Sequence, residues 1–537
     1  MLAWTIYISF LGVGILMLLP RDNARAARIT ALTAAIVGLV AAIGGALQTK
    51  AGEILTVTRL NWIPAIGSEY HLAADGISLT LVMLTGLAAV SGILFSWNIE
   101  LRAKEFFAFY LALIGGVYGV FLSFDLFLLF VFYELAIIPK YFLIAIWGST
   151  RREYGAMKLA LYSFVGSAMV LVGIIAAFVV SGAKTMSLFE LAKYPFPDSF
   201  QMWAFPLVFT GFAILAGIWP FHTWAPTGHV AAPTAASMLL AGVVMKLGAY
   251  GCLRVALTLF PKGLDEWTIQ PCGPAVVSGL MSHSFIESIQ WFLNLVFGFT
   301  SWRDFFGVLA LIGIVYGAMV ALVQKDFKFV IGYSSVSHMG FVLLGLVTLN
   351  EFGLRGAVLQ MFSHGVIAGL LFAVVGRMVY DRAHTRDLGE LSSMNLSKAL
   401  PFAAATFAIA GFASMGLPGF SGFVSELQVL IGAWHMSPTY AVIAGLGILI
   451  GVAYTLRALQ LAFFADHAEQ APMTPATISS NDHEKLEPIS VPERFGAMLL
   501  IGASLVIGLY PSLLLNRIVP SFSSPLFDGL RKVGGLP

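Results

Sequence analysis

The sequence predicts an all-α polytopic membrane protein, and two observations lead to that prediction. The 537 residues are 58% hydrophobic and only 11% charged, so a soluble domain of this size could not bury its apolar surface. The apolar residues also gather in about fourteen segments of about 20 residues, the length of a helix that crosses a bilayer. We therefore expect about fourteen transmembrane helices, near 3–20, 29–48, 77–97, 106–124, 125–148, 157–181, 200–221, 231–259, 304–323, 329–348, 355–379, 399–435, 440–464 and 494–515.

Two of these expected helices carry backbone interruptions. Trp-Pro-Phe-His at 219–222 breaks the seventh helix, and Gly-Leu-Pro-Gly at 416–419 breaks the twelfth. Proline and glycine free backbone groups, which are tolerated at membrane depth only where protein or a water-filled cavity satisfies them. The two interruptions lie five helices apart, and five is odd. We therefore expect two inverted five-helix repeats, each containing a broken helix, as in many transporters.

The expected organisation has six parts. A connection of mixed polarity separates the two repeats, and we expect it to form an interfacial or partly re-entrant helix rather than a further span. The parts are 1–105 with the first three helices, 106–260 with the first repeat, 261–303 with the connection, 304–465 with the second repeat, 466–493 as a polar loop, and 494–537 with the last helix and a short tail.

Lysine and arginine are unevenly distributed among the expected loops, and the positive-inside rule uses this bias to set the orientation. The loops after the first, third, fifth, ninth and eleventh helices are basic, whereas those after the fourth, tenth and twelfth carry almost no Lys or Arg. We expect a multi-pass protein of the inner (cytoplasmic) membrane with both termini on the non-cytoplasmic side. Lys325 and Lys328 fit anchors in one basic loop, and the mouth of a proton channel is the alternative.

Composition and motifs exclude several kinds of chemistry on this chain. The net charge of +2 gives no reason to expect a nucleic-acid partner. Cys252 and Cys272 form no CxxC pair and cannot alone hold zinc or an iron–sulfur cluster. The sequence has neither a GxGxxG fingerprint nor a Walker loop. Any redox or nucleotide chemistry is therefore expected on partner chains.

Six ionisable side chains lie inside otherwise apolar segments and are the candidate site residues. A charge at bilayer depth costs at least about 2.5–3.5 kcal/mol, and such residues usually pair or line ion paths. Several of them together predict a charge-handling pathway through the protein. The six residues are Glu134, Lys140, Lys246, His338, His364 and Glu426.

Several motifs, taken in order and spacing, resemble the Mrp-antiporter-like subunits of respiratory complex I, the proton-translocating NADH:quinone oxidoreductase. The resemblance covers about residues 70–465, and the motif after the eleventh helix, with the short tail, is similar to the M-type (chain 4) branch. The motifs are Phe-Tyr-Glu-Leu-Ala at 132–136, His-Thr-Trp-Ala-Pro at 222–226, Tyr-Ser-Ser-Val-Ser-His-Met-Gly at 333–340, His-Thr-Arg-Asp-Leu at 384–388 and Gly-Leu-Pro-Gly-Phe at 416–420.

The resemblance implies that protons move through half-channels of buried Glu, Lys and His side chains. It implies that NADH, FMN, iron–sulfur clusters and quinone are bound by partner subunits and that this chain holds no cofactor or redox centre. The implied partners are the L-type and N-type antiporter-like subunits, small membrane subunits and the lipid bilayer. The residues at the family's matching positions are Glu134, Lys246, His338, His364 and Glu426.

One position departs from the family pattern. The family usually has a lysine in the seventh helix, five residues before the proline, and here that position is Leu215. Lys140 stands in the fifth helix at a position that is commonly apolar, six residues from Glu134 and therefore about 240° around an ideal helix. Pro139 makes an ideal helix there unlikely. We hypothesise that Lys140 has taken over the role of the missing lysine; the alternative is a lysine that extends to the membrane interface.

Two other functions remain open at this point. The chain could be a subunit of a multi-subunit cation/proton antiporter or a membrane-bound hydrogenase, which share this ancestry. It could also be a structural spacer that does not pump, because the seventh helix lacks its lysine.

Four further polar residues have structural interpretations. Asp75 is expected to cap the third helix. Lys158 is expected either to modulate Glu134 or to anchor its helix at the headgroups. His222 and His229 flank the first interruption, where they either cap freed carbonyls or carry protons.

Overall fold

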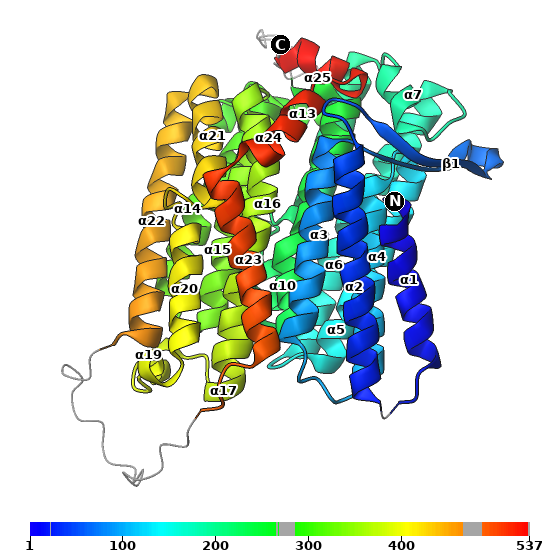
Figure 1. Ribbon diagram of the computed structural model, residues 1–537. Coiled ribbons are helices and arrows are strands. Elements are labelled where there is room, and N and C mark those ends of the chain that lie inside the picture. The colour runs from blue at the N-terminus through cyan, green and yellow to red at the C-terminus, as the bar shows by residue number, and fades with distance from the viewer. Residues whose placement is uncertain (22, 265–266, 268–284, 466–485, 535–537) are drawn as a thin grey trace.

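The computed structural model describes residues 1–21, 23–264, 267, 285–465 and 486–534, and there it is a bundle of long helices (Figure 1). Twelve helices in this part are long and apolar enough to cross a membrane. They are α2 (Ala24–Gln48), α3 (Gly76–Phe95), α4 (Ala103–Leu122), α5 (Leu126–Trp147), α6 (Arg152–Ser181), α8 (Asp198–Ala216), the run Thr234–Leu257, α14 (Trp302–Val323), α15 (Phe327–Val347), the run Glu351–Ala383, α22 (Pro438–Phe463) and α23 (Val491–Leu509).

Two of the fourteen expected spans fall outside these twelve. At 3–20 the chain forms α1 (Ala3–Leu18), a shorter apolar helix of 16 residues. At 399–435 it forms two helices, α20 (Pro401–Ser414) and α21 (Ser421–Met436). The all-α polytopic fold is confirmed, whereas the count of fourteen stays a prediction.

Both predicted interruptions are present. α8 ends at Ala216, and after Gly217 (φ +90°) and a cis Trp219–Pro220 bond the chain resumes as α9 (Trp224–Ala231). The indole of Trp224 donates to the carbonyl of Ile214 at 2.8 Å, which satisfies one group freed by the break. The second break separates α20 from α21 and includes two glycines with positive φ, Gly416 and Gly419.

Two of the long runs change their helical pitch. The first consists of α10 (Thr234–Leu239), the π-helical η2 (Leu240–Val244), α11 (Met245–Gly251) and the π-helical η3 (Cys252–Leu257). The second consists of α16 (Glu351–Ala373), the π-helical η5 (Val374–Tyr380) and α17 (Asp381–Ala383). π-Helical turns are rare and often mark functional positions, because they re-aim neighbouring side chains.

A β-hairpin at one end of the bundle was not expected from the sequence. β1 (Leu55–Ile63) pairs antiparallel with β2 (Ser68–Ala74), and the short helix η1 (Pro64–Ile66) forms the turn (Figure 1). Asp125, which caps α5, accepts hydrogen bonds from Ser68 Oγ at 3.0 Å and from the backbone N–H of Glu69 at 2.9 Å. These bonds attach the hairpin to the start of α5.

The remaining short elements lie at the two ends of the bundle. Figure 1 shows α7, α13, α24 and α25 at the same end as the hairpin, and α17 and α19 at the opposite end. α13 has 13 residues, fewer than a bilayer-crossing helix needs. Residues 265–266 and 268–284 of the predicted connection, like most of the predicted polar loop, lie outside the described residues. Their bounds are α7 (Leu188–Lys193), η4 (Pro261–Leu264), α13 (Phe285–Phe297), α18 (Leu388–Leu391), α19 (Leu396–Ala399), α24 (Ser512–Ser521), η7 (Pro525–Phe527) and α25 (Asp528–Gly534).

A buried ion pair ties the first helix run to the N-terminal helices. Asp75 caps α3 as expected, accepting from the N–H of Ser78 at 2.9 Å. Both carboxylate oxygens also lie 2.7 Å from Nη2 of Arg254 on η3. Tyr250 accepts from Nε of Arg254 at 3.1 Å, and Phe527 of the C-terminal segment covers the guanidinium. The side chain of Asp75 is 1% exposed and that of Arg254 is 0% exposed, so each buried charge is compensated by the other rather than by solvent.

Removing one partner should therefore destabilise the fold strongly. We expect Asp75→Ala to cost about 3–5 kcal/mol, because it leaves the Arg254 charge buried without its counter-ion. Thermal unfolding of the purified protein in detergent measures the loss. The matched control is Glu69→Ala, which breaks the more exposed Arg59–Glu69 pair and should cost about 0–1 kcal/mol. Equal losses in the two variants would contradict this interpretation.

Candidate functional site

Lys246 and His364 form a hydrogen-bonded pair inside the bundle. Lys246 lies directly after the π-helical η2, and its amine donates to the carbonyl of Ala241 in that widened turn. Its Nζ also lies 2.7 Å from Nδ1 of His364 on α16. Both side chains are buried. An amine and an imidazole in this contact can exchange a proton directly.

His338 and Glu426 form a second buried pair next to the first. Nδ1 of His338 on α15 lies 2.9 Å from Oε1 of Glu426 on α21, and its Nε2 lies 3.1 Å from Ser414 Oγ. The amide of Gln360 donates to the same carboxylate oxygen at 3.1 Å, and Ser425 donates to the amide oxygen of Gln360. The carboxylate is therefore held in one orientation toward the imidazole.

The two pairs adjoin one another. The rings of His338 and His364 have centroids 5.5 Å apart and planes inclined by 31°. A small cavity between α15, α16, α20 and α21 is lined by both imidazoles and by Gln360 and Glu426. We call Lys246, His364, His338 and Glu426 the central row. It brings four of the six candidate residues together as two hydrogen-bonded pairs whose imidazole rings are neighbours.

The other two candidates lie together on α5, which continues as a helix through Pro139. Lys140 is 1% exposed and donates to Ser163 Oγ on α6 at 3.2 Å. Glu134 is half-buried, and its Oε1 has no hydrogen-bond partner. The two charges influence each other electrostatically, but in the described part of the chain no ion pair joins them. Lys140 is thus buried in the protein rather than extended to the membrane interface.

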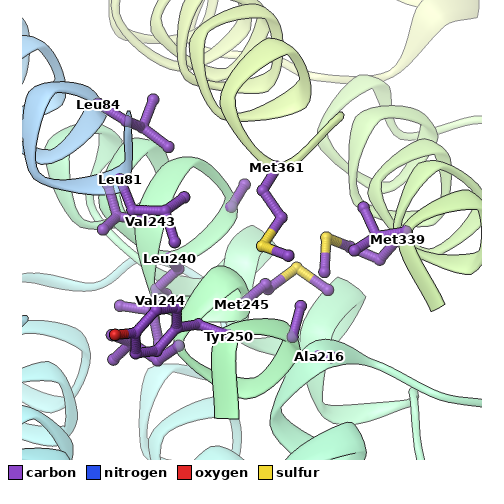
Figure 2. Close-up of a cluster of buried hydrophobic side chains, with 14 of the residues drawn as sticks. Leu81, Leu84, Ala216, Leu240, Val243, Val244, Met245, Tyr250, Met339 and Met361 are labelled. Carbon is purple, nitrogen blue, oxygen red and sulfur yellow. The ribbon is translucent and has the colours of Figure 1, made fainter. Parts of the chain in front are cut away.

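Leu215 lies in an apolar part of the bundle. It is buried near the end of α8, and its backbone approaches Gly248 of α11 closely. Figure 2 shows the side chains of Met245, Met339 and Met361 pointing toward one another beside Ala216. The position of Leu215 is therefore buried and carries no titratable group, and the neighbouring Ala216 lies beside the three methionines.

The structure also shows the contacts of three other basic residues, for which the sequence left alternatives open. Lys158 donates to Thr227 on α9 at 3.4 Å, so it links α6 to the broken helix. His229 does not cap a carbonyl, because both of its ring nitrogens are buried without a hydrogen-bond partner. Lys328 is not a surface anchor: it is 2% exposed and donates to the carbonyl of Ala232 at 2.9 Å. The sequence signal for Lys328 was ambiguous, since a lysine next to a basic loop is usually solvated.

Within the described ranges, no group of three or more His, Cys, Asp or Glu side chains is arranged to hold a metal ion. Cys252 is buried and free, and Cys272 lies outside those ranges.

The sequence matches the family model described as NADH:quinone oxidoreductase/Mrp antiporter, transmembrane, at residues 123–285 and 262–451. The chain belongs to this family. The matched ranges include all six candidate residues, and the resemblance seen in the sequence motifs is confirmed.

Individual relatives agree with the family assignment. The NADH-quinone oxidoreductase subunit M of Rhodobacter capsulatus is 34% identical over 86% of this chain and 82% of its own length. Subunit M of Escherichia coli K12 is 33% identical over 96% of both chains. A chain of respiratory complex I from Thermus thermophilus with bound NADH superposes with a TM-score of 0.80, at 25% identity and 99% coverage of both chains.

Proposed function

We propose that this protein is the M-type proton-translocating subunit of a complex I-like NADH:quinone oxidoreductase. The central row carries the proposal: an amine, two imidazoles and a carboxylate in sequence, buried inside a membrane bundle. Burying four such groups is costly unless they pair or conduct charge. Protons move along the row when quinone reduction in partner subunits shifts charge along the membrane arm.

The contacts support a stepwise relay. A proton on Lys246 passes to His364 through their shared hydrogen bond, and His338 passes a proton to Glu426 through theirs. Between the two imidazoles, a water molecule in the small cavity completes the path, since the cavity is lined by polar groups from four helices, α15, α16, α20 and α21. Gln360 keeps the acceptor oxygen of Glu426 directed at His338.

Glu134 and Lys140 control the relay from α5. The missing titratable group at Leu215 and the apolar packing around it favour a proton path that avoids α8. Lys140 supplies the buried amine that the mechanism needs near Glu134. Burial has the largest influence on the proton affinity of that amine, and the charge of Glu134 acts against it. In a medium of low dielectric, a change in the distance between two such charges alters their coupling by several kcal/mol.

The remaining chemistry belongs to partners in this proposal. NADH, FMN, iron–sulfur clusters and quinone are bound by other subunits, and the L-type and N-type antiporter-like subunits and small membrane subunits are the neighbours of this chain. The protein lies in the inner membrane with its basic loops toward the cytoplasm and both termini on the other side.

Two other functions compete with this proposal. Relatives named subunit M over nearly the whole chain favour complex I over a separate cation/proton antiporter or a membrane-bound hydrogenase. Leu215 favours a non-pumping spacer, since it removes one titratable group. The intact central row favours pumping.

The test is Glu426→Gln, which keeps the shape of the side chain but cannot release a proton. We expect normal assembly and normal electron transfer from NADH to an artificial acceptor, with a severalfold loss of quinone-coupled proton pumping in inverted membrane vesicles. The control is Glu190→Gln, at an exposed position on α7. Wild-type pumping by a fully assembled Glu426→Gln complex would remove Glu426 from the path.

A further inference from the structure

The C-terminal end of α9 is held by cations from the second half of the chain. Helix ends carry unpaired carbonyls and favour positive charge. Here the carbonyl of Val230 accepts from Nη1 of Arg386 at 3.1 Å, and that of Ala232 accepts from Nζ of Lys328 at 2.9 Å. Arg386 also pairs with Asp326 at 3.3 Å, at the cap of α15. Capping accounts for a positive charge at this end of α9, and Arg386 already supplies one. Capping alone does not account for a second, titratable cation there, the buried amine of Lys328.

His229 lies between that amine and the central row. The ring is fully buried, packs on Phe372 with centroids 4.9 Å apart, and has no hydrogen-bond partner at either nitrogen. Leaving a buried polar group unpaired costs about 1–3 kcal/mol. Its electrostatic neighbours are Lys246 and Lys328. An imidazole that makes no hydrogen bond with the described residues has no packing role here that a phenylalanine would not fill.

Lys328 lies near the end of the bundle that carries the basic loops. It stands in the first turn of α15, directly after the Lys325–Asp326 turn, and α15 packs against α9. The loop between α5 and α6 touches the same site, because the N–H of Ser149 donates to the carbonyl of Ala231 at 2.8 Å. Lys328 therefore contacts α9 three residues after His229, and His229 is in turn an electrostatic neighbour of Lys246.

We propose that Lys328 and His229 form a proton inlet from the basic end of the bundle to Lys246, built across the two halves of the chain. The inference rests on the proposed function. The Lys328 ammonium gives one proton to a ring nitrogen of His229, and the ring gives one to the Lys246 amine. Lys328 then regains a proton from water at the basic end. Arg386 holds the helix end but takes no part in transfer, because a guanidinium does not release its proton.

Lys328→Arg separates transfer from capping. Arginine keeps the positive charge and can still donate to Ala232, but it cannot release a proton. We expect the Lys328→Arg complex to assemble and to reduce an artificial acceptor normally, while quinone-coupled pumping in inverted vesicles falls at least about tenfold, since a positioned acid–base group typically contributes a factor of about 10²–10⁴. His229→Gln should give a similar loss. The control is Lys398→Met, which removes an exposed charge on α19.

Wild-type pumping by Lys328→Arg would show that Lys328 only caps α9 and would overturn the inlet, as would wild-type pumping by His229→Gln. If the Lys328→Arg complex does not assemble, His229→Gln decides the question, because in the described part of the chain the His229 ring makes no hydrogen bond whose loss would unfold the site. Glu426→Gln, measured alongside, separates the two proposals. If Glu426→Gln loses pumping while Lys328→Arg and His229→Gln pump normally, only the inlet is rejected. If all three variants pump normally, the relay along the central row is rejected as well.

Discussion

Replacing Lys246 with methionine is expected to lower the part of quinone-coupled proton pumping that this chain contributes at least about tenfold. Lys246 is the first residue of the central row and the end point of the proposed inlet, and its amine contacts both Ala241 and His364. Methionine has a similar length and a flexible, adaptable side chain, so packing should survive. Dye quenching in inverted membrane vesicles energised with NADH measures the loss.

The control for Lys246→Met is Lys193→Met, which removes a solvent-exposed lysine on α7. It should pump normally. If Lys246→Met also pumps normally in a fully assembled complex, the amine is not part of the path and the central row has no role in transport.

Lys140→Ala should impair pumping as strongly as Lys246→Ala, if Lys140 has taken over the role of the seventh-helix lysine. The mechanism needs a titratable amine near Glu134, and Lys140 is the buried amine on that helix. The double change Lys140→Met with Leu215→Lys returns the amine to the position its relatives use, so we expect it to restore part of the pumping. The same vesicle assay measures both variants.

A blue-native gel must first show that each Lys140 variant assembles, because Lys140 also bonds to Ser163 and its loss could loosen α5 from α6. Normal pumping by an assembled Lys140→Ala complex would reject the replacement of the seventh-helix lysine by Lys140. The spacer interpretation, or a relay that uses the central row alone, would then take its place.

The broken helices could be predicted because their cause is local. Proline and glycine restrict or free the backbone wherever they stand, so α8 ends before Trp219–Pro220 and α20 ends before Gly416. The six candidate residues could be predicted for a similar reason, because an ionisable side chain is rare inside an apolar membrane segment.

Contacts between distant segments could not be predicted in this way. Arg254 stands in an apolar span, but its partner Asp75 is 179 residues away, and one sequence does not show which helix faces which. The burial of Lys328 depends on the packing of α9 against α15. The hairpin did leave a signal, a run of β-branched and aromatic residues at 55–63, but a short strand pair beside so many apolar helices was easily overlooked.

The number of protons translocated per NADH oxidised tests the account most directly. It would be measured with the purified complex in proteoliposomes, comparing wild type with Lys246→Met at matched rates of electron transfer. A relay through this chain predicts fewer protons per NADH in the variant, because the remaining subunits still pump while this one does not. An unchanged ratio would contradict the account and would leave this chain as a structural spacer of the membrane arm.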